Sequence, residues 1–122
     1  MVIQSHLELD VWKLAMELAR DVYRLARLMP KQEEYRLTGQ MISAAVSIAA
    51  NIAEGSARGT RKDYAHFVSI AKGSAAELET LLLLAGDAEL VSRDVTEGVL
   101  EKTDRVARML TRLHARLKET QA

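Results

Sequence analysis

The carboxylates of Glu54 and Glu77 are the side chains of this sequence that come closest to a catalytic pair. Two such groups could share general acid and general base catalysis if two helices brought them together in a pocket open to solvent. No third residue near either of them in the sequence completes such a mechanism, and the chain has neither a nucleophile motif nor a phosphate-binding glycine loop. The sequence therefore predicts that the protein is not an enzyme, and a site at Glu54 and Glu77 is the alternative.

Metal-binding side chains are also sparse. A di-iron centre in a helical bundle needs a Glu-x-x-His pair on each of two helices and two further glutamates that face inward. An acidic residue has this spacing from a histidine only at Asp63 and His66, where Asp63 is expected to cap the start of a helix. The chain has no cysteine, so it has no thiolate ligands and no disulfides. No metal and no cofactor are predicted.

Three polar residues, Asn51, Ser74 and Glu77, occur in phase with apolar residues rather than opposite them. Polar groups buried at such positions can fix how packed helices are aligned, as single polar residues do in coiled coils. We therefore expect these three residues to form a hydrogen-bonded cluster between two helices, with a structural role.

Basic residues form two local groups in a chain that has 17 basic and 17 acidic residues and no net charge. The first group is a turn that contains Arg58, Arg61 and Lys62. The second is the end of the last predicted helix, where Arg112 and Arg116 have no acidic residue four positions earlier. Because a neutral chain can bind nucleic-acid phosphates only through a local basic patch, these five residues are the candidates for such contacts.

Four long amphipathic segments must position all these side chains. In the first, third and fourth segments the apolar residues recur at alternating spacings of four and three, which is typical of helices that pack along a seam. The second segment contains a run of small residues, AAVSIAANIA, that lets a neighbouring helix approach closely. Pro30 separates the first two segments, Gly55 suits the left-handed position after a helix, and Thr60 with Asp63 suits a capping box. The predicted helices cover residues 9–29, 33–55, 61–86 and 92–118. The sequence thus predicts a single all-α domain, residues 1–122, folded as an antiparallel up-down-up-down four-helix bundle.

The first and third predicted helices each carry a second apolar row beside the first one. Trp12 and Tyr23 belong to the second row of the first helix, and Phe67 belongs to the second row of the third helix. A face of this width can pack between two neighbours of the same bundle, or one of its rows can contact another subunit. Under the second interpretation, Trp12, Tyr23 and Phe67 lie in an interface between subunits.

The first residues of the chain lack the basic and apolar regions of a signal peptide. No apolar run approaches the roughly 20 residues that a membrane span needs. We therefore expect a cytoplasmic protein.

The central part of the sequence resembles the 23S rRNA intervening-sequence proteins, a family of small four-helix bundles. The resemblance rests on NIAEG at 51–55, IAKGS at 70–74 and ELE at 77–79, and it extends to LDVW at 9–12 and EYRLTGQ at 34–40. The chain departs from the family pattern at Ala49, where a proline is usual, and at Ile42 and Ser43, where basic residues are common. The motif positions that the resemblance singles out are Asn51, Glu54, Gly55, Gly73, Ser74 and Glu77.

The resemblance implies a ring-shaped homopentamer, and for most of this family no biochemical activity is known. A relative, the accessory protein of diversity-generating retroelements, associates with a reverse transcriptase and nucleic acid. Two functional hypotheses follow. The first is a non-enzymatic oligomeric scaffold whose partner is the protein itself. The alternative is an accessory protein that binds RNA or DNA through the basic patches of the assembled ring, in which repetition strengthens a weak contact.

Overall fold

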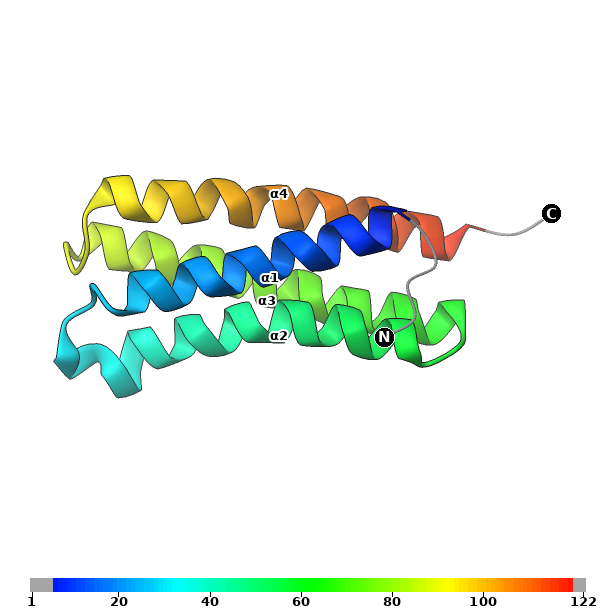
Figure 1. The fold of residues 1–122 in the computed structure, drawn as a ribbon, viewed down its shortest axis with the longest axis horizontal. Helices are drawn as coiled ribbons and strands as arrows, with labels where there is room; N and C mark the ends of the chain where they lie inside the picture. Colours follow the sequence, from blue (N-terminus) through cyan, green and yellow to red (C-terminus); the bar gives the residue numbers. More distant parts are fainter. Residues whose placement is uncertain (1–5, 120–122) are drawn as a thin grey trace.

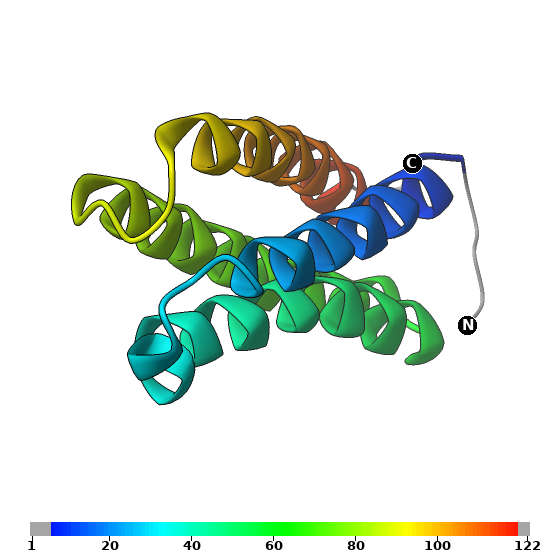
Figure 2. The ribbon, with the colours of Figure 1, turned by 60° about the vertical axis from the view of Figure 1, so that its left-hand side comes forward.

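The computed structural model describes residues 6–119, which form a bundle of four long helices (Figures 1 and 2). Neighbouring helices run in opposite directions, so the predicted all-α up-down-up-down bundle is confirmed (Figure 1). The start of α1, the end of α2, the start of α3 and the end of α4 meet at one end, which we call the α2–α3 end. The long helices are α1 (His6–Ala26), α2 (Gly39–Ala57), α3 (Arg61–Asp87) and α4 (Arg93–Lys118).

The core consists of the apolar rows that the sequence indicates. Every member of the first apolar row of α1 and of α3 is at most 8% exposed, because residues spaced by three and four lie on one face of a helix. These residues are Val11, Ala15, Leu18, Val22 and Leu25 in α1, Met29 in the turn that follows α1, and Tyr64, Val68, Ala71, Ala75, Leu78, Leu82 and Ala85 in α3. Within residues 6–119, no helix combines the length and the apolar character needed to cross a bilayer.

The predicted helix over residues 33–55 is interrupted near its start. A 3₁₀ turn, η1 (Lys31–Glu33), and a π-helical turn, η2 (Glu34–Thr38), precede α2. Arg36 has φ −115° and ψ −113°, which lie outside the helical region. Gly39 permits the wide turn, since a Cβ at this residue would lie only 3.0 Å from the Glu34 carbonyl oxygen. The regular α-helix therefore begins later than predicted, at Gly39.

The glycines of the turn between α2 and α3 have other roles than predicted. The assignment of Gly55 to the left-handed position after α2 is wrong, because α2 continues to Ala57 and the positive φ, +90°, occurs at Gly59. Gly55 is buried inside the helix, where a Cβ would lie 2.8 Å from both Phe67 Cβ and Tyr64 Cδ1. The absence of a side chain at Gly55 thus allows α3 to approach α2 closely.

One of the two contacts of the predicted capping box is present at the start of α3. The Thr60 hydroxyl accepts a hydrogen bond from the backbone N–H of Asp63 at 3.1 Å, and α3 begins at Arg61. This hydrogen bond satisfies one of the backbone donors that a helix start leaves without an intrahelical partner. It also fixes the position of Arg61, which lies at the α2–α3 end.

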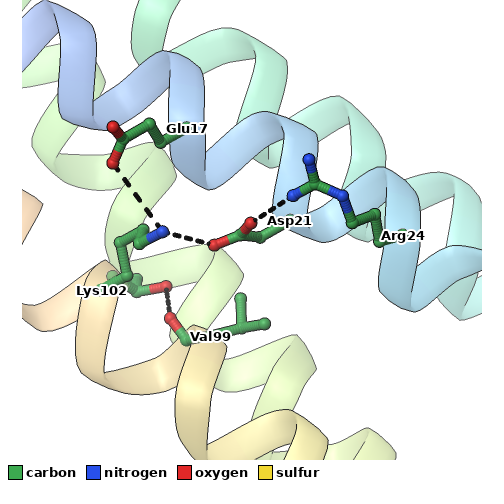
Figure 3. Close-up of polar contacts among 6 residues, drawn as sticks. Glu17, Asp21, Arg24, Val99 and Lys102 are labelled. Atoms are coloured by element: carbon green, nitrogen blue, oxygen red, sulfur yellow. Dashed lines mark hydrogen bonds and ion pairs between the residues drawn. The ribbon is translucent and has the colours of Figure 1, made fainter.

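An ion-pair network joins α1 to α4 (Figure 3). The Nζ atom of Lys102 on α4 lies 2.7 Å from Oδ2 of Asp21 and 3.8 Å from Oε2 of Glu17, both on α1. Arg24 donates a hydrogen bond of 2.8 Å to the other oxygen of Asp21. Because the Lys102 and Asp21 side chains are only 26% and 23% exposed, water screens this contact less than it screens a surface pair. The network fixes how α1 and α4 are aligned.

Candidate functional site

A hydrogen-bonded contact between α2 and α3 contains two of the three residues that the sequence assigns to a polar cluster. The Ser47 and Ser74 hydroxyl oxygens lie 2.8 Å apart, and the Asn51 side-chain amide donates to the Ser47 carbonyl at 2.8 Å and to the Ser47 hydroxyl at 3.0 Å. Ser47 therefore connects Asn51 to Ser74, and it is the member that sequence reasoning left out of the cluster. The three residues are partly buried, and we call them the α2–α3 polar contact.

Glu77 and Glu54 lie apart from this contact and from each other. Glu77 is exposed, and among the described residues it has no hydrogen bond or ion pair. Because Ser47 faces Ser74 in antiparallel helices, Glu54 and Glu77 are separated by about 15 Å along the bundle at 1.5 Å per residue. Glu54 is instead paired with Arg58 at 2.7 Å. The arrangement does not form a carboxylate pair, and the expectation that Glu77 joins the polar cluster is wrong.

The two glycines of the motif differ in their surroundings. Gly55 is in tight contact with Tyr64 and Phe67, as described above. An added Cβ at Gly73 meets no atom within 4 Å, and the residue is exposed on α3. Packing therefore explains a glycine at position 55 and does not explain one at position 73.

A cavity of about 400 Å³ opens at the α2–α3 end, where all four helices meet. Three of its polar residues are buried: Glu8 is 4%, Tyr64 5% and Ser56 8% exposed. Glu8 and Ser56 are not among the predicted site residues, and Tyr64 was expected only as a member of the apolar row of α3. Glu8 precedes Val11 by three residues and Ala15 by seven, so its phase within α1 is the signal that could have placed it inside. The lining is Glu8, Gly55, Ser56, Gly59, Thr60, Arg61, Tyr64, Leu113, Arg116 and Leu117.

The phenol of Tyr64 is held neutral in this cavity. Burial raises its pKa, the negative charge of Glu8 and a contact with the Glu8 carboxylate raise it further, and the Ser56 hydroxyl lowers it in part. The hydroxyl oxygen is buried and has no hydrogen bond of normal geometry among the described residues. Tyr64 therefore keeps its proton at physiological pH and has hydrogen-bonding capacity directed into a cavity.

The basic residues of the two predicted groups meet in part. Arg61 at the start of α3 donates a hydrogen bond to the main-chain carbonyl of Arg116 near the end of α4, so the two groups adjoin at the α2–α3 end. Lys62 and Arg112 are exposed there, on the first turn of α3 and one turn before Arg116. Arg58 is less available, since its guanidinium pairs with Glu54 and lies 4.8 Å from the centre of the Phe67 ring.

An apolar groove of about 350 Å³ lies between α1 and α2. Its lining on α1 includes Trp12 and Tyr23, the two residues of this helix that the sequence assigns to an interface between subunits. Its lining on α2 includes Val46. Trp12 is partly buried, whereas Tyr23 and Val46 are 48% and 42% exposed. The groove also contains Met16, Ala19, Arg20, Ala49, Ala50 and Ala53.

The third predicted interface residue, Phe67, lies elsewhere. It is partly buried on α3, with Ile70 and Leu84 in the same apolar row, and these are 40% and 51% exposed. We call Phe67, Ile70 and Leu84 the α3 stripe. The stripe borders Ser74, which contacts α2, so it faces the α2 side of α3 rather than the groove between α1 and α2. The structure thus has two separate apolar surfaces.

The described residues contain no group of three or more histidine, aspartate or glutamate side chains arranged to hold a metal ion. His66 packs its ring against the edge of Phe67, with ring centres 5.5 Å apart. Asp63 serves the cap of α3 through its backbone N–H. The site consists, then, of a polar cavity, a basic cluster beside it and two apolar surfaces.

Comparisons with known proteins give one family. The sequence model of a family described as 23S rRNA-intervening sequence protein matches residues 7–112, from the start of α1 into α4. No curated protein matches the chain.

One solved structure with a similar fold is that of a protein of unknown function from the S23 ribosomal protein family of Bacteroides thetaiotaomicron. The two chains superpose with a TM-score of 0.83, over 89% of this chain and 98% of the other. Their sequences are 24% identical, so this similarity shows a common fold.

Proposed function

Because the chain belongs to the 23S rRNA-intervening sequence protein family, we propose that it is a non-enzymatic scaffold that assembles with copies of itself into a ring of five subunits. The observation that supports assembly most directly is the apolar groove between α1 and α2. Its walls carry Trp12, Tyr23 and Val46, and the last two leave nearly half of their side-chain surface in water. Aromatic and apolar side chains gathered in a groove are typical of protein interfaces. The number five rests on the family resemblance.

The two apolar surfaces favour a ring over a two-fold dimer. A two-fold contact uses the same patch on both subunits, whereas a contact between unlike patches repeats around a ring. The groove is built from α1 and α2, whereas the stripe consists of residues of α3, so the two patches have no residue in common. We propose that the α3 stripe of one subunit, with Ile70 and Leu84, packs into the groove of the next.

Charge placed in the groove tests this proposal. Val46→Glu puts a carboxylate on a partly exposed position of the groove wall, so the variant should fold and fail to assemble. The control is Tyr35→Ser, which removes an aromatic side chain that is 93% exposed and lies outside the groove. Molar mass from light scattering and helix content from circular dichroism are measured for both. An assembled Val46→Glu variant with unchanged mass would contradict the proposal.

A second candidate function is binding of RNA or DNA by the assembled ring. The specific observation in its favour is the hydrogen bond from Arg61 to the Arg116 carbonyl, which brings two basic segments of the chain together. Exposed Lys62 and Arg112 extend this cluster, and each subunit of a ring would add another copy. Phosphate contacts of this kind carry no sequence preference.

The nucleic-acid candidate is tested with labelled single-stranded RNA and DNA at two salt concentrations. Alanine at Arg112 and Arg116 together should weaken binding and reduce the dependence of affinity on salt, since fewer counterions are released. Arg27→Ala is the matched control, because Arg27 is an exposed arginine at the opposite end of the bundle. Equal affinity and equal salt dependence in all three proteins would rule this candidate out.

A further inference from the structure

We propose that the cavity at the α2–α3 end binds a small zwitterion, whose ammonium group faces Glu8 and whose carboxylate or phosphate faces Arg61 and Arg116. The cavity belongs to a single subunit, and its polar floor has no role in the proposed assembly. Its volume of about 400 Å³ falls in the range of small-molecule sites.

The floor of the cavity would bind the ammonium group of the ligand. Glu8 and Tyr64 are 4% and 5% exposed and contact each other, with the Ser56 hydroxyl also beside Tyr64, so the buried floor of the cavity is polar and carries the negative charge of Glu8. The Tyr64 hydroxyl is buried without a hydrogen bond of normal geometry among residues 6–119. An ammonium group placed between Glu8 and Tyr64 would donate to the carboxylate and to the phenol oxygen at once.

The rim of the cavity would bind the carboxylate or phosphate of the ligand. Arg61 and Arg116 line it from α3 and α4 and are both exposed, so their charges face water at the mouth. The hydrogen bond from Arg61 to the Arg116 carbonyl fixes the two segments beside each other. Guanidinium groups in this position suit a carboxylate or a phosphate, which they can bind through two hydrogen bonds.

The positive and negative groups of the ligand must belong to one molecule if the ligand is to fit both ends of the cavity. An anion that filled the cavity would lie against the Glu8 carboxylate, and a cation that filled it would lie against Arg61 and Arg116. A molecule that carries both an ammonium group and an anionic group satisfies both ends. Between the ends, Leu113 and Leu117 form an apolar wall, which suits a short hydrocarbon group.

The experiment uses the whole chain and matched probes in isothermal titration calorimetry. L-Leucine represents an amino acid, and phosphoethanolamine represents an amino phosphate. Two analogues of leucine each lack one charge: 3-methylbutylamine has no carboxylate, and 4-methylpentanoate has no ammonium group. We expect one of the two zwitterions to bind with a Kd of about 1 mM or tighter, and each single-charge molecule to bind at least about tenfold more weakly.

Substitutions of the lining residues test whether the zwitterion binds in this cavity. Tyr64→Phe, Glu8→Gln and Arg116→Ala should each weaken it at least about fivefold, because each removes one polar contact. Arg116 is exposed, so its variant is expected to fold even if a buried substitution does not. Tyr35→Phe and Glu79→Gln, which alter residues outside both the cavity and the groove, should leave the binding unchanged. Absence of binding by both zwitterions at 10 times that Kd, equal binding of the single-charge molecules, or unchanged binding by Arg116→Ala would each overturn the proposal.

Discussion

The hydroxyl oxygen of Ser47 on α2 lies 2.8 Å from that of Ser74 on α3, 27 residues further along the chain. The Asn51 amide donates to Ser47 and completes a small polar contact between two helices whose buried residues are mainly apolar. A shift of one helix past the other by a single turn would separate these groups by about 5.4 Å and leave partly buried hydroxyls unpaired. The contact therefore specifies how α2 and α3 are aligned.

Loss of this contact should measurably destabilise the fold. Ser74→Ala removes the hydroxyl that meets Ser47 and should lower the free energy of unfolding by about 0.5–1.5 kcal/mol. Glu77→Ala, one turn further along α3 at an exposed position, should change it by less than about 0.5 kcal/mol. Urea unfolding at one fixed protein concentration compares the variants, because assembly makes stability depend on concentration. Equal effects of the two substitutions would refute the role of Ser74.

The two motif glycines should respond to alanine in opposite directions. Gly55→Ala places a Cβ 2.8 Å from Phe67 Cβ and Tyr64 Cδ1, so α2 and α3 must separate, at a cost of about 1–3 kcal/mol. Gly73→Ala meets open space in the middle of α3 and should stabilise the helix by up to about 1 kcal/mol. Thermal unfolding of the two variants measures this contrast. A Gly55→Ala protein as stable as the wild type would show that the close approach at Gly55 is dispensable.

Tyr64 should make stability depend on pH in the alkaline range. Its pKa in the folded protein is raised above the value of about 10 that an unfolded tyrosine has, chiefly by burial and also by the charge of Glu8. The resulting stabilisation is fully present below pH 10 and is lost as the pH rises above it, since the unfolded chain then ionises first. Urea unfolding between pH 8 and 11 should show this loss in the wild type and a smaller loss in Tyr64→Phe. The phenolate absorbance gained at pH 10 should be equal in the two folded proteins.

The ion pair between Lys102 and Asp21 should contribute to the packing of α1 on α4. Asp21→Asn should cost up to about 1 kcal/mol, and the cost should fall as salt is added. Asp87→Asn is the matched control, because its pair with Arg93 is exposed on both sides, at 64% and 69%. Urea unfolding at low and high salt should distinguish the two variants. A larger effect of Asp87→Asn than of Asp21→Asn would contradict the importance of partial burial.

The sequence was sufficient to predict the bundle because its signals are local and periodic. The spacing of Val11, Ala15 and Leu18 along α1 indicates both the helix and its buried face. The cap at Thr60 is likewise local, because it joins two residues that are three positions apart. The interruption at η2 was missed, since Arg36 departs from helical geometry without a proline or glycine at that position to signal it.

The candidate sites were predicted less completely because they depend on which helices come together. Asn51 and Ser74 were recognised as polar residues in an apolar phase, but their link through Ser47 needs the alignment of α2 with α3. Glu77 carried the same signal, and it is exposed because it lies at the edge of the buried face. The cavity with Glu8 and Tyr64 is formed by four helix ends, which no single segment of sequence describes.

The central claim, assembly into a ring of five, is tested most directly by the mass of the unmodified protein in solution. Native mass spectrometry, with sedimentation velocity at two concentrations as a check, gives the number of chains in each particle. We expect one dominant species with five times the chain mass of 13.6 kDa, unchanged between the two concentrations. A monomer at tens of micromolar would contradict it and would leave the apolar groove between α1 and α2 without its proposed occupant.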